Sequence, residues 1–298
     1  MQHLIVAAVV ALSVVGSAQA QDQPRTPRAS DKRTRDIYVS VVDKDGKAVT
    51  GLTAADFRVR EDNVVREVLS AGVATEPVTI SLLIDDSEAS ADAIQDMREA
   101  LTAFVERLDG KAEIAVATIG ERPTSQLDFT TSTVALKRTV GRIFQRSGAG
   151  AYLLDGLLDA SKGLEKRAPK RPAIVVITTE AGPEFSNRSY QQVLEALARS
   201  GAALHVLAIG QPSSSQTDEM RNRNMVLGEG PDKSGGRHDQ VLVPLGLKDR
   251  MLQLADELTG QYVVQYGRPE QLIPPEKVQV TVNRPGVTVR ARSRATDK

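Results

Sequence analysis

The chain has 298 residues, no cysteine, and equal numbers of basic and acidic residues, 38 of each. A neutral chain lacks the overall positive charge that attracts nucleic acid or anionic lipid, and a chain without cysteine cannot rely on disulfides for stability. The length is sufficient for one large domain, or for one large and one small domain, held together by a hydrophobic core.

Residues 1–20 have the pattern of a secretory signal peptide. An apolar segment over residues 4–15 is followed by the small-x-small sequence Ala18-Gln19-Ala20. This pattern predicts cleavage after the last of these residues and export to the periplasm or the medium. The apolar segment is short for a bilayer span, so we expect no stable membrane anchor after signal cleavage.

Polar residues with two prolines occupy positions 21–35, and they are predicted to form a flexible tether. An N-terminal β element follows over residues 36–73. Its first strand alternates apolar and polar residues up to a turn predicted at Asp45-Gly46, and a second turn is predicted at Asp62-Asn63.

A C-terminal β element is predicted over residues 267–298. Valines alternate with polar residues on both sides of Pro285-Gly286, a pair that suits a tight turn. Neither β element is large enough to be stable alone. We therefore expect the element at 267–298 to pair with the one at 36–73 in a small β subdomain.

Between these elements, residues 77–266 alternate continuous apolar segments with amphipathic ones. Residues 93–108 and 247–258 place apolar side chains at helical spacing, whereas 173–179 is continuously apolar or β-branched, as expected of a buried strand. Such alternation predicts an α/β fold with a doubly wound, mostly parallel sheet. Residues 211–240 are predicted to form a long polar loop, and two interpretations stay open: a mobile segment, or a surface loop that binds a partner.

The predicted strand at residues 78–84 runs directly into the sequence Asp-Asp-Ser-Glu-Ala-Ser. Ligands of open α/β sheets bind beyond the carboxyl ends of the strands, and carboxylate and hydroxyl oxygens are the ligands that hard cations prefer. The position and composition of this loop therefore raise the question of a metal site.

The run SLLIDDSEAS resembles the first strand and metal-binding loop of a von Willebrand factor A (VWFA) domain. The segments VVDKDGKAVTGLTAADFRVRED, SGGRH, ELTGQYVVQY and VTVNRPGVTVRAR are similar to parts of an exported bacterial VWFA-related family first noted in acidobacteria. The resemblance covers residues 36–294. It implies a Rossmann-like domain that binds proteins through a metal-ion-dependent adhesion site (MIDAS), formed by Asp-x-Ser-x-Ser, a later threonine and a later aspartate.

Compared with that motif, two of the five ligand positions are kept and three are altered. Asp85 and Ser87 match the first aspartate and the first serine. The altered positions are Ala89, Ala151 and Thr179. Since alanine supplies no oxygen and the lost aspartate removes a charge, we expect a degenerate site without a metal or other cofactor.

Two other interpretations of these residues stay open. Glu180 follows the altered aspartate position, and with Asp85 and Ser87 it defines a weak, non-standard site for Mg²⁺, Mn²⁺ or Ca²⁺. Alternatively, Asp85 and Ser87 simply cap the helix that follows them.

No catalytic constellation is recognisable in the sequence. Phosphate-loop, dinucleotide-binding and nucleophile-elbow motifs are missing, and a hydrolase based on Asp85 and Asp86 lacks a nameable base and nucleophile. His205 lies in an apolar segment and is expected to be part of the core. The sequence therefore favours a non-enzymatic protein-interaction module with a protein partner in the cell envelope or outside the cell, ahead of a cation-dependent ligand binder.

Overall fold

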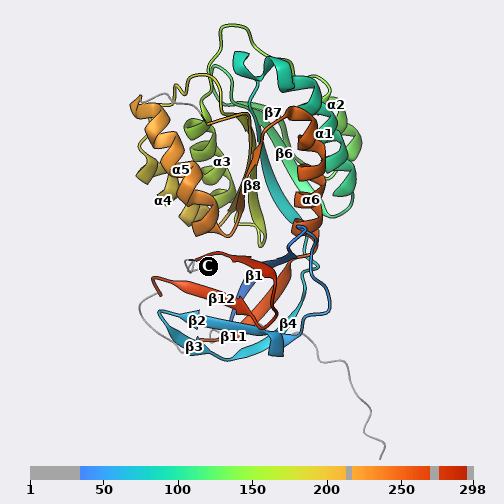
Figure 1. Ribbon diagram of the computed structural model, residues 1–298, viewed down its shortest axis with the longest axis vertical. Coiled ribbons are helices and arrows are strands. Elements are labelled where there is room, and N and C mark those ends of the chain that lie inside the picture. Colours follow the sequence, from blue (N-terminus) through green and yellow to red (C-terminus); the bar gives the residue numbers. More distant parts are fainter. Residues whose placement is uncertain (1–33, 213–216, 269–274, 294–298) are drawn as a thin grey trace, which may run out of the picture. The chain divides into compact units, whose positions relative to one another are not determined.

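The computed structural model describes residues 34–212, 217–268 and 275–293, and a six-stranded sheet lies between its two groups of helices (Figure 1). The strand order is β10-β9-β8-β5-β6-β7, with β7 antiparallel to β6 and the other pairs parallel. Strands β5 and β8 are buried at every position because both faces of the sheet are covered. The six strands are β5 (Val78–Ile84), β6 (Ala112–Thr118), β7 (Thr124–Thr130), β8 (Pro172–Thr179), β9 (Ala203–Ile209) and β10 (Arg237–Val241).

Helices cover the two faces of this sheet in two groups of three (Figure 1). One face packs against α1 (Ile94–Arg107), α2 (Thr133–Val140) and α6 (Leu247–Thr259). The other face packs against α3 (Leu153–Arg167), α4 (Tyr190–Ser200) and α5 (Asp218–Ser234). Short 3₁₀ helices are η1 (Ala54–Asp56), η2 (Glu88–Ala93) and η3 (Pro244–Gly246). The predicted doubly wound, mostly parallel α/β fold is confirmed.

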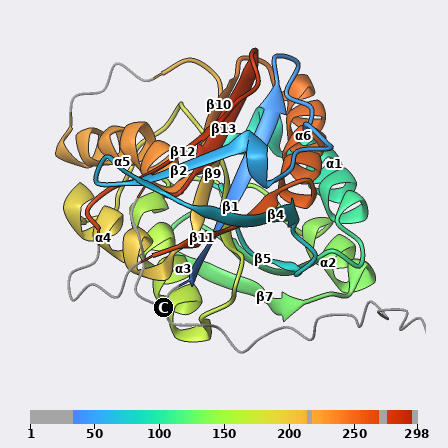
Figure 2. The same cartoon turned by 90° about the horizontal axis from the view of Figure 1, so that it is seen from below.

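The remaining strands form two antiparallel sheets, which we call the β layer. One sheet has the order β13-β1-β11-β4 and the other β12-β2-β3 (Figure 2). Strand β1 pairs with β13, and β2 pairs with β12, so N-terminal and C-terminal segments do form one subdomain, as predicted. The strands are β1 (Thr34–Asp43), β2 (Phe57–Glu61), β3 (Val64–Arg66), β4 (Val68–Val73), β11 (Tyr262–Gly267), β12 (Val278–Val282) and β13 (Val287–Ala291).

The prediction of a long loop over residues 211–240 was wrong. Most of this segment forms helix α5 and edge strand β10. Two glycines and Pro231 in the second half of α5 disguise the helix, because these residues have poor helix propensity. Gly230 is required by packing, since a Cβ atom there would lie 2.9 Å from Cδ2 of Leu204.

Three predicted boundaries also differ or lie outside the described residues. Strand β1 begins at Thr34 and therefore includes the last two residues of the predicted tether. Strand β11 belongs to the β layer, although its sequence was assigned to the α/β domain, because it pairs with β1 and β4. The signal peptide predicted at 1–20 and the rest of the tether lie outside the described residues. In the described ranges, no helix has both the length and the hydropathy needed to cross a membrane.

A buried carboxylate, Glu257 on α6, joins the α/β domain to the β layer. Its side chain is 0% exposed and lies 3.1 Å from Nη1 of Arg237 on β10 and 3.1 Å from Nη1 of Arg290 on β13. Burial by itself raises the pKa of a carboxyl group, but the His205 ring in its protonated form and these two guanidiniums outweigh burial, so the pKa of Glu257 is lowered. Glu257 therefore ties its own helix, α6, to β10 through Arg237 and to β13 through Arg290.

His205 lies on β9 and is fully buried, as its apolar segment predicted. Neither ring nitrogen has a hydrogen-bond partner among the described residues. Burial lowers the pKa of His205 to about 4; Glu257 acts in the opposite direction, and Arg237 and Arg290 add to the lowering. The ring is therefore neutral in the folded protein at neutral pH.

We expect His205 to make the folded state sensitive to acid. Its pKa is lower in the folded than in the unfolded chain, so the unfolded chain binds more protons between pH 6.5 and 4. The stabilisation is complete above pH 6.5 and is lost as the pH falls through this interval, by about 3 kcal/mol in total. Urea denaturation of wild type and His205→Leu at pH 7, 6, 5 and 4.5 measures this loss. The unfolding free energy of wild type should fall relative to that of His205→Leu as the pH falls, whichever protein is the more stable at pH 7.

The control for this experiment is His238→Leu, because His238 is exposed on β10. Its difference from wild type should stay constant to within about 0.5 kcal/mol. A pH dependence of His205→Leu that parallels wild type over the whole range would contradict the assignment.

Candidate functional site

Three loops meet at the carboxyl ends of the central strands and form what we call the crevice. The backbone N–H of Glu88 donates to the carbonyl of Ala149 at 3.0 Å, and the N–H of Phe185 donates to the carbonyl of Ala151 at 2.8 Å. Backbone bonds therefore hold the loops against one another. The loops comprise residues 85–90 after β5, 146–152 before α3, and 180–186 after β8.

Asp85 directly follows β5 at the bottom of the crevice and is 0% exposed. Its Oδ1 accepts the N–H of Ser87 at 3.0 Å. Its Oδ2 accepts three donors at 3.1 Å each: the hydroxyl of Thr178, and both the N–H and the hydroxyl of Thr179. Four internal donors thus satisfy this carboxylate, and Oδ2 has no capacity left for another ligand.

Glu180, the next acidic residue of the crevice, forms a buried ion pair with Arg223 of α5. Oε2 of Glu180 lies 3.0 Å from Nη1 of Arg223, and the two side chains are 8% and 3% exposed. The guanidinium also donates to the carbonyl of Thr179 at 2.9 Å. A protein cation therefore already neutralises Glu180.

The other predicted site residues offer few oxygen atoms that could act as metal ligands. Ala89 and Ala151 lie in two of the loops that form the crevice, and a Cβ atom at Gly182 would come within 2.7 Å of the Ala89 methyl group. Ser87 is the N-cap residue of η2, but its side chain makes no capping bond. Ser90, one position beyond the second serine of the motif, donates its hydroxyl to the carbonyl of Ser87 at 2.7 Å. The capping interpretation is thus wrong for both side chains: Asp85 accepts the N–H of Ser87, which precedes η2, and the Ser87 side chain makes no capping bond.

Asp86 points away from the bottom of the crevice and fastens the loop that precedes α3. Its Oδ1 accepts the N–H of Gly120 at 2.7 Å, and its Oδ2 lies 2.8 Å from Nε of Arg146. Arg146 also contacts Glu121 at 3.1 Å. Asp86 is therefore a structural residue, held by an arginine that the sequence did not single out.

Glu184 and Phe185 lie in the third loop and were also missed by the sequence-based prediction. The Glu184 carboxylate accepts the N–H of Leu153 at 3.3 Å and the N–H of Ser186 at 3.0 Å, which places it at the start of α3. Burial raises the pKa of Glu184, although these bonds and Arg223 act against it. Phe185 exposes 49% of its surface. No motif marks either residue.

Above these buried groups, the crevice opens into a pocket of about 280 Å³, which we call the crevice pocket. Its lining is almost free of polar side chains, with Glu88 as the charged residue and Phe185 as the aromatic one. The lining residues are Glu88, Ala89, Gly148, Ala149, Gly150, Gly182, Pro183 and Phe185.

Comparison with known protein families identifies this arrangement. The model of the von Willebrand factor type A domain matches residues 79–230, which is just over half of the chain. The chain belongs to the von Willebrand factor type A family. The match begins in β5 and ends in α5, and it includes all three crevice loops. No curated protein matches the chain significantly.

Solved structures with similar folds include a von Willebrand factor type A protein from Catenulispora acidiphila. Its TM-score is 0.50 at 14% identity, and the match covers 91% of this chain and 76% of that one. Proximal thread matrix protein 1 from the mussel byssus, solved with a zinc-occupied MIDAS motif, has a TM-score of 0.50 at 15% identity over 65% of this chain and 49% of that one. At these identities the likeness shows the fold of the A domain.

The residues of this A domain do not fit a divalent cation well. Mg²⁺ takes about six oxygen ligands at short distances. Here Oδ2 of Asp85 is saturated by internal donors, Glu180 is paired with Arg223, and two ligand positions are alanine. The described ranges contain no group of three or more acidic, histidine or cysteine side chains that could hold a metal. Oδ1 of Asp85 and Oγ of Ser87 remain, which is too few protein ligands for a preorganised site.

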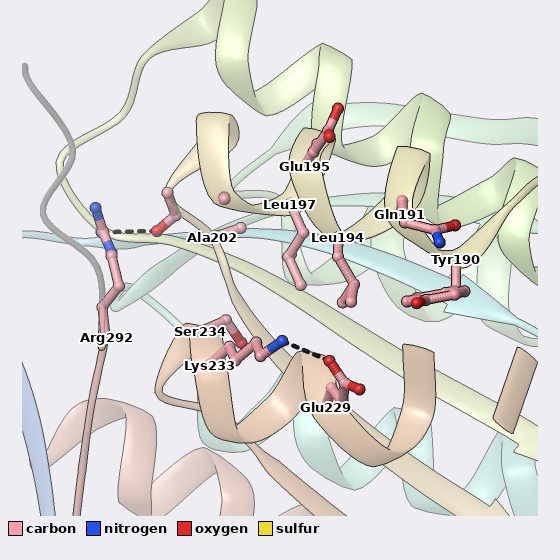
Figure 3. Close-up of a pocket in the computed structure, with 12 residues that line it drawn as sticks. Tyr190, Gln191, Leu194, Glu195, Leu197, Ala202, Glu229, Lys233, Ser234 and Arg292 are labelled. Carbon is pink, nitrogen blue, oxygen red and sulfur yellow. Dashed lines mark hydrogen bonds and ion pairs between the residues drawn. The ribbon is translucent and has the colours of Figure 1, made fainter. Parts of the chain in front are cut away.

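A second pocket, of about 310 Å³, lies between α4 and α5 and contains none of the predicted site residues (Figure 3). Leu194 and Leu197 of α4 point across it toward α5, where Lys233 pairs with Glu229. At one end Arg292 donates to the carbonyl of Gly201 at 2.7 Å, at the C-terminus of α4. We interpret this pocket as a gap between helices α4 and α5. Arg292 helps to fasten the C-terminus of α4 to the β layer.

The most important residue missed by sequence reasoning is Arg223, because it lies in the segment that was predicted to be a loop. A signal for the helix was present. Thr217 caps α5 by accepting the N–H of Met220 at 3.2 Å, and it is followed by Asp218 and Glu219, acidic residues that suit a first helical turn. Which helix residue meets Glu180 depends on how α5 packs, so the sequence alone does not reveal the pair.

Proposed function

We propose that the chain is an exported, non-enzymatic protein-interaction module whose degenerate A domain binds a partner at the crevice without a metal ion. The observation that carries this proposal is the internal neutralisation of the crevice carboxylates. Asp85 accepts four protein donors, and Glu180 is paired with Arg223. These contacts take the place of the interactions that a cation would make.

Two further points support an interaction module over an enzyme. Asp85 and Asp86, the residues of the hydrolase alternative, are both engaged in loop-fastening bonds and are not free to act as a base. Apart from Glu88, the crevice pocket is lined by alanine, glycine, proline and phenylalanine, so it offers no set of base, nucleophile and oxyanion donors. Export rests on the signal-peptide pattern of residues 1–20, and it implies a partner in the cell envelope or outside the cell.

A cation-dependent binder is the second candidate. The observation in its favour is that Oδ1 of Asp85 accepts a single donor, while Ser87 beside it has no side-chain capping bond. These two oxygens could take part in weak coordination of Mg²⁺, Mn²⁺ or Ca²⁺ if water supplied the remaining ligands. The two candidates differ in whether partner binding depends on a free divalent cation.

We expect the mature chain to capture its partner through the crevice, equally well with and without chelator. Chemical crosslinking to the native envelope fraction, followed by affinity purification, compares wild type with Ala181→Trp and Ala55→Trp. Ala181 is exposed in the third crevice loop, and Ala55 is exposed in η1 of the β layer. A tryptophan at 181 should reduce capture by about tenfold or more, because it obstructs the docking face, whereas tryptophan at 55 should leave capture unchanged.

Melting temperatures of both variants must match wild type for the comparison to hold. Capture that EDTA abolishes and Mg²⁺ restores favours the cation-dependent candidate. Capture that Ala55→Trp reduces and Ala181→Trp does not reduce would move the binding face to the β layer and contradict the proposal.

A further inference from the structure

The walls of the crevice pocket are apolar, and a single charged side chain lies among them. Six of the eight lining residues are glycine, alanine or proline, and Phe185 is the seventh. Such walls favour an incoming aliphatic chain. The charge and orientation of the occupant must therefore be set by Glu88 and Phe185.

Glu88 is held as a ready acceptor at the edge of this pocket. Its Oε2 accepts the N–H of Gly148 at 3.1 Å, which fixes the side chain across the loop. In the described part of the chain, Oε1 makes no hydrogen bond and Glu88 has no ion-pair partner. Glu88 is exposed, so one carboxylate oxygen faces the pocket and solvent. It can accept a charge-assisted hydrogen bond from a partner without breaking an internal one.

Phe185 presents an aromatic face to the same pocket. Its ring lies against the backbone at Gly150, where a Cβ atom would come within 2.2 Å of Cε2, so this position tolerates only glycine with the ring in place. The ring also contacts Tyr152, at 6.0 Å between centroids. Packing thus holds the ring while 49% of the residue stays exposed, and an exposed aromatic face attracts cations.

The charges around the pocket agree with this arrangement. Five acidic side chains lie in the crevice loops, and two guanidiniums pair with two of them, leaving an excess of negative charge. The acidic residues are Asp85, Asp86, Glu88, Glu180 and Glu184, and the guanidiniums are Arg146 and Arg223. A partner carboxylate, which an accessible metal ion would attract, is repelled here, while a partner cation is attracted.

We infer that the crevice pocket receives a lysine or arginine side chain of the protein partner. The aliphatic stem lies against the alanine and proline walls, and the cationic head lies between the Glu88 carboxylate and the Phe185 ring. This inference rests on the proposed function, because it names the chemistry of the partner at the same face. The partner side chain is then positively charged, whereas a crevice with an accessible metal ion selects a negatively charged one.

Small side-chain analogues test the inference without knowledge of the partner. The probes are Nα-acetyl-lysine methylamide and Nα-acetyl-arginine methylamide, which keep their side-chain charge. Each is added to the ¹⁵N-labelled mature chain at constant ionic strength. Backbone amide resonances of Gly148, Gly150 and Gly182 should shift saturably with both probes. The matched N-acetyl-norleucine and N-acetyl-glutamate methylamides should leave them unshifted, since the first lacks the charge and the second reverses it.

Substitutions then assign the two recognition residues. Glu88→Gln and Phe185→Leu should each raise the dissociation constant of the lysine probe by about fivefold, which corresponds to about 1 kcal/mol. Asp92→Asn is the matched control, because Asp92 is exposed in η2 and does not line the pocket; it should have no effect. Resonances distant from the crevice report that each variant is folded.

Three results would overturn the inference. The norleucine derivative could shift the glycine resonances as much as the lysine derivative does, the glutamate derivative could shift them more, or neither the lysine nor the arginine derivative could shift them. A saturable shift of the same resonances by MgCl₂ that blocks the lysine probe would also overturn it, in favour of a metal site. If Ala181→Trp abolishes partner capture but the lysine probe does not shift the three glycine resonances, this inference is refuted and the proposed function stands. Loss of both refutes both.

Discussion

Replacement of Glu257 by glutamine is expected to lower the free energy of unfolding by about 3 kcal/mol, because it removes the buried anion that two arginines share. Glu257 is the shared anion of Arg237 and Arg290, at 3.1 Å from each. Arg237 keeps a second partner, Asp239, whereas Glu257 is the ion-pair partner of Arg290 among the described residues. The loss should therefore weaken the attachment of β13 in particular.

Urea denaturation at pH 7 measures this effect, and the neighbouring residue provides a matched control. Asp256 lies next to Glu257 on α6, but its ion pair with Arg107 is exposed, at 42% and 54% of the two side chains. Asp256→Asn should cost less than about 1 kcal/mol, because solvent screens exposed pairs. Equal losses in the two variants would mean that burial of the Glu257 network contributes nothing to stability.

The second large effect is expected at the crevice. Arg223→Leu should destabilise the folded state by about 3 kcal/mol, because it leaves the Glu180 carboxylate buried without a counter-ion and removes the donor to the Thr179 carbonyl. The control on the same helix is Arg221→Leu, whose ion pair with Asp218 is exposed at 68% and 82%. Its loss should stay within about 1 kcal/mol.

A double-mutant cycle with Glu180→Leu separates the ion pair from simple packing. The Glu180→Leu/Arg223→Leu variant should recover most of the stability that Arg223→Leu loses, since a buried pair replaced by apolar residues is often close to neutral. Additive losses in the double variant would show that the two side chains act independently. Thermal or urea denaturation of the four proteins provides the cycle.

These two ion pairs explain how the protein maintains buried charge at the crevice and at the junction between the α/β domain and the β layer. In both places a carboxylate on one element meets a guanidinium from an element far away in the sequence, Glu180 with Arg223 and Glu257 with Arg290. Removing one member of such a pair is costly, so each pair ties its two elements together. At the crevice, the same tie leaves Glu180 unavailable to a metal.

Much of the fold could be predicted because it depends on local patterns. Continuous apolar runs became β5 and β8, helical periodicity became α1 and α6, and Asp62-Asn63 forms the β2–β3 turn with φ angles of 47° and 69°. Helix α5 was missed because glycines and a proline in its second half obscure the local signal, while packing of Gly230 against Leu204 supports the helix.

The sequence by itself determined most of the order of strands and helices, though not α5 and β10, and it determined the pairing of the two β elements. It also determined the alanines and threonine that replace ligands of the metal site, because periodicity and side-chain chemistry are properties of the chain. Only the tertiary structure decided which partners the remaining side chains of the crevice contact. Asp85 received its donors from β8, Glu180 received Arg223 from α5, and Phe185 came to lie on Gly150. Each of these partners is distant along the chain, so packing of the elements, and not any local pattern, brings them together.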